Sequence, residues 1–289
     1  MANMTAARPK SGLRLKGWQL FLYLVLTLGV ALVAIPMYWT LAASFMTRGE
    51  AIATRWFPSQ FQFQNYVEAW QEANFSEYFF NSLLITGITM AGVVVFSVLA
   101  AYAFARMEFV GKNFLFTLLI STLFIPSMVQ LLPNFLLVTW LGRIGPMAWI
   151  DNWPALTIPF MGNIFVIFLL RQFFAQLPDD LFDAATIDGA GHLQAIRYIV
   201  LPLSKAVLMT VIILTFIASW NILDWPLLVT NSEKWRPIAV GLTQFISEEQ
   251  QRVHLQMAGA VITIVPVLLL YFITQKQFTE GIAQTGLKG

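Results

Sequence analysis

The sequence contains no cysteine, so it can form neither a disulfide nor a thiolate metal site. Its only histidines, His192 and His254, fall in different loops, and no spacing typical of a metal site is present. The loops also offer no convergent nucleophile or acid–base pair, and no G-x-x-x-x-G-K-[ST] motif for a nucleotide. We therefore expect no catalytic residue, no metal site and no cofactor on this chain.

Charge is scarce as well: 11% of the residues are charged, against about 25% in an ordinary soluble domain. A net charge of +2 spread over the loops gives no indication of a nucleic-acid partner. The charged residues leave six uncharged, mostly apolar stretches, at 17–47, 78–105, 113–142, 152–170, 206–223 and 253–275. A helix needs roughly 20 such residues to cross the hydrocarbon core of a membrane. The sequence thus predicts an all-α polytopic membrane protein with six transmembrane helices, surrounded by lipid.

Other readings of the apolar stretches fit poorly. A soluble protein of this length would have too little polar chain to cover six buried helices, and a membrane barrel needs alternating rather than continuous apolar residues. The first stretch is also much longer than the apolar core of a signal peptide, about 7–15 residues. We expect one membrane domain over 18–277, an N-terminal tail at 1–17 and a C-terminal tail at 278–289.

Lysine and arginine predict the orientation. Six spans place both termini on one side, and the segments of that side hold eleven of the 17 Lys and Arg residues, against six on the other. Cytoplasmic segments carry the excess of positive charge in membrane proteins. Both termini are therefore expected in the cytoplasm.

The segment 171–205 differs from the other loops. Pro178, Asp179 and Asp180 form a typical helix start, with proline at the first helical position and acids near the positive end of the helix dipole. Gly189 is a typical stop, so a short helix is expected between them. A second amphipathic piece follows, with Leu193, Ile196, Ile199 and Val200 at helical spacing, and it ends at Leu201-Pro202. The residues alone fit a docking helix and an ordinary solvated loop equally well.

A longer pattern in this segment is specific. Asp183-Ala184-Ala185 is followed by Asp188-Gly189-Ala190 and then by Ile199, Leu201 and Pro202. This resembles the cytoplasmic loop of bacterial ATP-binding-cassette importer permeases, where Glu-Ala-Ala, Asp-Gly-Ala and Ile-x-Leu-Pro occur in this order. Asp183 replaces the usual glutamate and shortens its reach by one methylene, and Ala206 stands where a proline often occurs.

The resemblance covers nearly the whole chain from the first stretch onward. Residues 101–107 are similar to the end of the second span in maltose-type and glycerol-phosphate-type permeases, and residues 220–228 are similar to their fifth span. The loop around Arg236-Pro237 and the tail with Phe278 and Gly281 also resemble the smaller of the two permeases in carbohydrate importers.

The resemblance implies a function. It implies a bacterial inner-membrane permease of an importer for a sugar or sugar-like solute, paired with a second permease, two ATPase subunits and an extracytoplasmic solute-binding protein. The partner is expected to be a different permease, giving a heterodimer. ATP and Mg would be bound by the ATPase, and the loop at about 175–202 would contact it through Asp183, Ala184, Ala185, Asp188, Gly189 and Ala190. The C-terminal tail, 284–289, resembles tails that reach toward the ATPases.

Residues of a solute pathway are harder to predict. Asp224 is the one charge expected within a span, where a carboxylate is costly and is commonly functional. Asn221, Trp225 and, more weakly, Asn163 join it as candidates. Two alternatives remain open at this point. Asp224 could instead be the proton site of a proton-coupled secondary transporter, and a membrane enzyme would need an active site that the loops do not offer.

Overall fold

The computed structural model describes residues 17–246 and 252–286, and within them it contains helices and no strand. The long helices are α1 (Gly17–Ser44), α4 (Phe75–Arg106), α6 (Ser127–Ile144), α12 (Lys205–Trp220) and α15 (Val253–Gly286). Between them lie α2 (Arg48–Ile52), α3 (Gln64–Glu72), α5 (Lys112–Ser121), η1 (Thr122–Phe124), α7 (Trp153–Thr157), η2 (Ile158–Phe160), α8 (Ile164–Phe174), α9 (Asp179–Ile187), α10 (His192–Ala195), η3 (Ile196–Val200), α11 (Leu201–Leu203), α13 (Asp224–Val229), η4 (Glu233–Trp235), α14 (Ile238–Gly241) and η5 (Leu242–Phe245).

Four segments of the described residues are long and apolar enough to cross a membrane as they stand: Gly17–Ser44, Phe75–Arg106, Trp153–Phe174 and Val253–Gln275. Two further spans are each a bent pair of helices, Lys112–Phe124 with Ser127–Ile144 and His192–Leu203 with Lys205–Trp220. The predicted all-α membrane class is confirmed, and the predicted six spans are reached when each bent pair counts as one.

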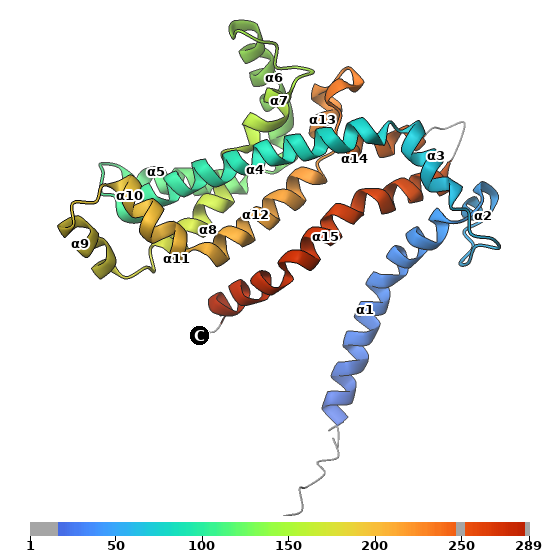
Figure 1. Ribbon diagram of the computed structural model, residues 1–289, viewed down its shortest axis with the longest axis horizontal. Coiled ribbons are helices and arrows are strands. Elements are labelled where there is room, and N and C mark those ends of the chain that lie inside the picture. The colour runs from blue at the N-terminus through green and yellow to red at the C-terminus, as the bar shows by residue number, and fades with distance from the viewer. Residues whose placement is uncertain (1–16, 247–251, 287–289) are drawn as a thin grey trace, which may run out of the picture.

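The third predicted span is not a continuous helix. Its two halves meet at an angle of 108°, and the break lies at Ile125 and Pro126. Pro126 has no N–H to donate and disfavours the helical conformation in the residue before it. Ile125 is accordingly extended, with φ −82° and ψ 118°. As a result, α6 and α7 project away from the other long helices (Figure 1).

The region before α12 differs from expectation in a second way. Pro202 was expected to stop the helix at Leu201, yet Leu201 is helical with φ −59° and ψ −45°. The five residues before it, η3, form a π-helical turn, whose wider winding leaves room for the proline ring. The bend of 84° comes at the next break, beside Ser204.

Helix α4 forms the centre of the bundle and packs against α8 and α12, while α12 also packs against α15 (Figure 1). Apolar clusters hold it near both ends. Near the C-terminal end of α4, Tyr102 packs with Leu170 and Phe174 of α8. Near its N-terminal end, Phe75 packs with Trp220 of α12. Since such buried side chains interlock closely, α4, α8 and α12 form one packed unit.

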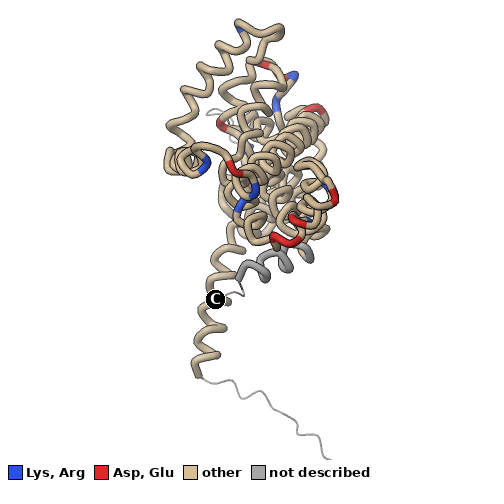
Figure 2. Tube along the Cα trace, turned by 90° about the vertical axis from the view of Figure 1, so that its left-hand side faces the viewer, with Lys and Arg blue, Asp and Glu red and all other residues tan. Residues whose placement is uncertain are grey.

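Helix α1 lies apart from this unit. It approaches α15 near its C-terminal end, where Ala42, Ala43 and Ser44 are buried, while the rest of the helix is largely exposed. The Asn65 side chain fixes that end by donating hydrogen bonds to the carbonyls of Ser44 and Met46, at 2.9 and 2.8 Å. Figure 2 shows no charged residue along α1. A helix that is apolar on all sides and exposed in the isolated chain fits a lipid environment.

Candidate functional site

The segment with the specific motif folds as the sequence predicts. Helix α9 runs from Asp179 to Ile187, with Asp179 and Asp180 in its first turn. Pro178 is the N-cap residue, one position earlier than predicted. Gly189 has a φ of +76°, and its N–H donates to the Thr186 carbonyl at 3.0 Å, while Ala190 N–H donates to Ala185 at 2.8 Å. The glycine therefore ends the helix in the left-handed conformation that other residues adopt at a cost.

The motif residues face outward. Asp183, Ala184, Asp188 and Gly189 are exposed, whereas Ala185 and Ala190 are half-buried. Large apolar side chains are exposed beside them: 86% of Ile187 and 40% of Leu181 are accessible. Exposed apolar groups beside free carboxylates are typical of a surface that another protein covers. The predicted docking residues thus lie together on α9 and the three residues that follow it, at one end of the molecule (Figure 1).

One arginine holds the start of α9. Arg106, the last residue of α4, forms an ion pair with Asp179, and its guanidinium lies 4.3 Å from the centre of the Phe182 ring. Phe182 and Leu177 are the partly buried residues through which this part of the chain meets the apolar cluster of α4 and α8. The remainder of α9 projects from the bundle.

The second amphipathic piece is only partly as predicted. Ile196 and Val200 are buried and Ile199 is half-buried, but Leu193 is 73% exposed. Leu193 lies in α10 just after the helix starts, on the side of the segment that stays exposed, so its helical spacing does not bury it. His192 reaches the bundle instead, with its Nδ1 3.1 Å from the hydroxyl oxygen of Tyr102.

The four candidates for a solute pathway have different surroundings. The Asn163 side chain accepts a hydrogen bond from Val166 N–H at 3.1 Å and caps α8. The Asn221 side chain donates to the Ile217 carbonyl at 2.9 Å, within its own helix. Trp225 is buried, and its indole N–H donates to the Ala155 carbonyl at 2.8 Å. The polar groups of all three side chains are thus hydrogen-bonded to the backbone. The bond of Trp225 joins α13 to α7.

Asp224 is placed differently. It was expected within a span, but α12 ends at Trp220 and Asp224 begins the short helix α13 after a three-residue break. Its side chain is exposed, and it has no hydrogen-bond or ion-pair partner among the residues that the structure describes. An acid in the first turn is stabilised by the positive end of the helix dipole, which removes part of the cost expected for an intramembrane carboxylate. Of the four candidates, Asp224 is therefore the one whose side-chain polar group has no partner among the described residues, so its carboxylate is free to bind a ligand.

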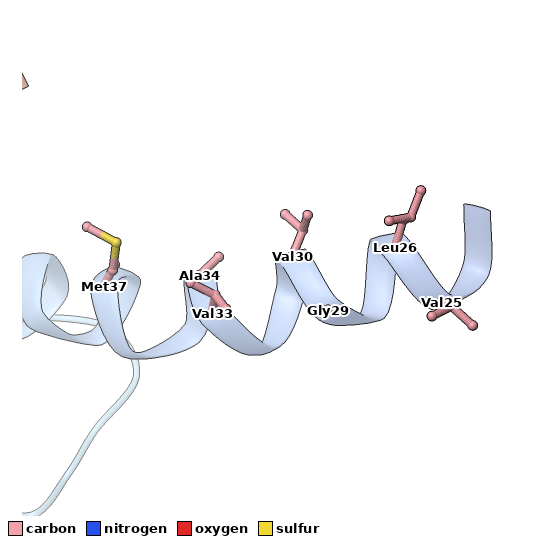
Figure 3. Close-up of a pocket in the computed structure, with 7 residues that line it drawn as sticks. All are labelled: Val25, Leu26, Gly29, Val30, Val33, Ala34 and Met37. Atoms are coloured by element: carbon pink, nitrogen blue, oxygen red, sulfur yellow. The ribbon is translucent and has the colours of Figure 1, made fainter. Parts of the chain in front are cut away.

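The hollow along α1 does not enclose a site. It has a volume of about 530 Å³ and is lined by seven residues of that helix alone, from Val25 to Met37 (Figure 3). With no second element to close it and no polar side chain in its wall, it offers nothing to orient a polar solute. Across residues 17–246 and 252–286, no three His, Cys, Asp or Glu side chains come together as metal ligands would.

Sequence reasoning missed the contacts of Arg106 and Tyr102. Both residues lie in the stretch 101–107 that carries part of the resemblance, but Arg106 and Asp179 are 73 positions apart, and Tyr102 and His192 are 90 apart. A charge at the end of an apolar stretch is ordinary in membrane proteins, so local pattern gave no signal. Only the side-by-side packing of α4 and α8 brings these groups together.

Comparison with known proteins gives one consistent result. The sequence family described as "Binding-protein-dependent transport system inner membrane component" matches residues 93–279. The chain is 31% identical over 274 residues to the sn-glycerol-3-phosphate transport system permease protein UgpE of Brucella abortus (strain 2308), covering 91% of this chain and 95% of that one. It is 30% identical over 265 residues to the diacetylchitobiose uptake system permease protein NgcG of Streptomyces coelicolor, covering 90% and 86%.

Solved structures agree in fold. A chain from the crystal structure of a bacterial ABC transporter involved in the import of the acidic polysaccharide alginate superposes with a TM-score of 0.79, at 23% identity, over 90% of this chain and 96% of that one. A chain from the alginate ABC transporter in complex with an alginate pentasaccharide-bound periplasmic protein gives a TM-score of 0.68 at 17% identity, over 90% and 95%.

Proposed function

The chain belongs to the family of binding-protein-dependent transport system inner membrane components, and on that premise we propose that it is the permease subunit through which an ATP-driven importer passes a sugar or sugar-like solute. The observation that carries the proposal is the exposed motif on α9. Asp183, Ala184 and Asp188 are presented to solvent beside Ile187 on a helix that the bundle holds mainly at its start. Such a helix can be seated in another protein without unfolding the bundle.

The proposed partners are those expected for a permease of this family. Two ATPase subunits bind ATP and Mg, and one of them receives α9, whose free carboxylates suit arginine or lysine side chains of that subunit. A second, different permease completes the pathway, and an extracytoplasmic binding protein delivers the solute. This chain contributes transport and no chemical step. The related alginate transporter has been described together with its periplasmic protein, which supports the last of these partners.

The orientation completes the proposal. The chain is a multi-pass protein of the bacterial inner membrane, with α9 and both termini on the cytoplasmic side, because Lys and Arg are in excess there. The membrane domain covers 18–277, with its coupling loop at about 175–202. Residues 1–16 of the N-terminal tail lie outside the described residues. So do 287–289, the end of the C-terminal segment proposed to reach toward the ATPases.

The solute class rests on the relatives. The names of two of them refer to sn-glycerol-3-phosphate and diacetylchitobiose, a small polyol phosphate and a sugar. We propose a hydroxyl-rich solute of this kind, with the free carboxylate of Asp224 accepting hydrogen bonds from its hydroxyl groups. Asn221 and Asn163 then shape the walls of the pathway from the ends of α12 and α8, and Trp225 does so from α13, which its hydrogen bond joins to α7. The alternative of a proton-coupled transporter that uses Asp224 finds no support among the relatives.

The first experiment identifies the partners. The tagged chain is purified from its native membrane in mild detergent, and all proteins that remain bound are identified by mass spectrometry. We expect an ATPase with a phosphate-binding loop and a second permease. If the chain is recovered alone and still transports in vesicles without ATP, the proposal is wrong.

A second experiment tests α9 itself. The double variant Asp183→Leu with Gly189→Leu places bulky neutral groups on the exposed motif, and we expect it to abolish uptake in vesicles that contain the whole complex and ATP. The control is Asp180→Asn, which changes an exposed acid on the same helix outside the motif. Undiminished uptake by the double variant, properly inserted and at wild-type abundance, would contradict the proposal.

A further inference from the structure

The guanidinium group of Arg106 has an unusual number of partners for the end of a membrane helix. Its Nε–H donates to the Phe174 carbonyl at 3.0 Å, and its two terminal nitrogens donate to the Leu177 carbonyl and to the Asp179 carboxylate. The face of the group lies over the Phe182 ring. The Arg106 side chain is only 11% exposed, whereas that of Asp179 is 84% exposed. The arginine is therefore the buried, fixed partner and α9 is the peripheral one.

These contacts need an arginine. The two carbonyls belong to the last turn of α8 and the link after it, where a helix leaves carbonyls without its regular hydrogen bonds. The Phe174 carbonyl also accepts a hydrogen bond from Leu177 N–H, at 3.3 Å. A planar group with five N–H donors can bond both carbonyls and the carboxylate at once while its face packs on an aromatic ring. A lysine ammonium has three donors and no flat face, so it could satisfy only part of this set. Arg106 joins three elements: α4, the end of α8 and the start of α9.

A second contact lies one helical turn away on the same helix. The Tyr102 hydroxyl lies 3.1 Å from Nδ1 of His192, the first residue of α10, and the two rings meet edge to face. Residues four apart lie on the same face of a helix, so Tyr102 and Arg106 both point toward the segment that contains α9. Arg106 holds the chain where α9 begins, and Tyr102 holds it just after α9 ends. The last turn of α4 thus contacts the coupling loop on both sides of the exposed helix.

From this geometry we infer that Arg106 is the positioning residue that makes α4 follow the displacement of α9. The inference rests on the proposed function, since it takes the ATPase to be what displaces α9. Helix α4 packs along α8 and α12, and packed helices of this kind move as rigid elements rather than deforming continuously. A displacement of α9 reaches the bundle through the Arg106 guanidinium and is then carried along α4. Without it, the start of α9 is held mainly through Phe182 and Leu177 and can move relative to α4, while Tyr102 still contacts the chain after α9.

The test uses the whole complex in vesicles, with the binding protein and solute on one side and ATP on the other. Arg106→Gln removes the charge and most donors, Arg106→Lys keeps the charge, and Lys112→Gln is the control. Lys112 is a neighbouring cation whose ion pair is with Glu108 and not with α9. Uptake and ATP hydrolysis are measured together. We expect Arg106→Gln to keep hydrolysis and to lose about tenfold in solute taken up per ATP, within the range of typical coupling free energies. Arg106→Lys should recover part of the loss, and Lys112→Gln should match wild type.

A distance measurement shows whether Arg106 transmits the displacement of α9 to α4 or only stabilises the fold. Because the chain has no cysteine, spin labels can be attached at cysteines introduced at Asp180, on α9 outside the motif, and at Val110 beyond α4, both exposed. In wild type the distance between the labels should stay the same with and without trapped nucleotide. In Arg106→Gln it should change with nucleotide, because α9 moves and α4 does not.

The outcomes are distinct. Unchanged uptake per ATP in Arg106→Gln, or a label distance that stays constant in this variant, overturns the inference. Failure of Arg106→Gln to bind the ATPase also overturns it, since the residue would then serve assembly. Absence of ATP-driven uptake by the wild-type complex contradicts the proposed function itself, so the two failures cannot be confused.

Discussion

The indole N–H of Trp220 donates a hydrogen bond to the carbonyl of Thr263 at 2.9 Å and so joins α12 to α15. Trp220 is fully buried, stacks on Phe216 with ring centres 5.4 Å apart and meets Phe79 edge to face at 5.5 Å. This one side chain therefore connects α12 to both α15 and α4.

We predict graded losses of stability at Trp220. Trp220→Phe keeps an aromatic ring but loses the hydrogen bond, so it should lower the unfolding free energy by about 0.5–1.5 kcal/mol. Trp220→Ala also opens a cavity and should cost about 3–5 kcal/mol. Thermal unfolding of the purified protein in detergent measures both. The control is Trp140→Phe, because Trp140 is 55% exposed; equal effects at the two tryptophans would contradict the role given to Trp220.

A close approach requires glycine at position 241. A Cβ atom there would lie 2.5 Å from Cε1 of Phe75 and 3.0 Å from Cδ2 of Tyr78. Both are atoms of buried rings that cannot swing aside, so Gly241→Ala should destabilise the protein by about 1–3 kcal/mol. Gly87→Ala in α4 is the control, since nothing lies within 4 Å of its Cβ position, and it should be neutral or slightly stabilising.

Thermal unfolding can also show whether the Phe75 ring causes the loss of stability expected for Gly241→Ala. Combining Gly241→Ala with Phe75→Leu removes the ring that the new methyl group meets. We expect the double variant to lose less stability than the sum of the two single variants, because contacting residues are not additive. Strict additivity would show that the ring of Phe75 is not the obstacle.

When Gly189 is replaced by a residue smaller than leucine, its backbone conformation should matter more than the size of the new side chain. Its φ of +76° lies in the left-handed region, and nothing lies within 4 Å of its Cβ position. Gly189→Ala should strain the end of α9 by about 1–2 kcal/mol and reduce uptake by the complex. Gly189→Asn should retain much more uptake, because asparagine tolerates this conformation although it is the larger side chain. If Gly189→Asn reduced uptake more than Gly189→Ala, the effect would follow side-chain size and would contradict the backbone explanation.

Asp224 offers a test between mechanisms. If its carboxylate accepts hydrogen bonds from a solute, Asp224→Asn keeps an acceptor oxygen and should retain most uptake, while Asp224→Leu should reduce it strongly. ATP hydrolysis should persist in both. A proton-coupled mechanism instead requires a titratable group, so Asp224→Asn would abolish uptake. Initial uptake rates in vesicles, with and without an imposed pH gradient, distinguish these results.

Glu50 is expected to make stability depend on pH. Hydrogen bonds from the Ser59 hydroxyl, from Thr47 N–H and from Ser59 N–H to its carboxylate lower the pKa of Glu50 to about 2, from 4.5. A lowered pKa means that this stabilisation is complete above pH 4.5 and is lost as the pH falls toward 2. The difference in melting temperature between wild type and Glu50→Gln should therefore shrink across this interval. A difference that stays constant from pH 6 to pH 2 would contradict the assignment.

Much of the fold of this protein can be predicted from the local sequence. The six uncharged stretches predicted the membrane class, and Pro178 and Gly189 predicted α9 to within one residue, because helix starts and stops depend on neighbouring residues only. The break at Pro126 also has a local cause, since proline disfavours the helical conformation in the residue before it. Leu193 shows the limit of periodicity, since helical spacing does not reveal which side of a short helix the bundle covers.

The sequence by itself determined which segments are apolar enough to span a membrane and where the motif helix begins and ends, since both depend on residues close together in the chain. The tertiary structure alone decided that Arg106 meets Asp179, that Tyr102 meets His192 and that Trp220 meets Thr263. It also decided that Asp224 begins a helix after a break and is exposed. These facts depend on how α4, α8, α12 and α15 pack, and side-chain partners distant in sequence leave no trace in local spacing.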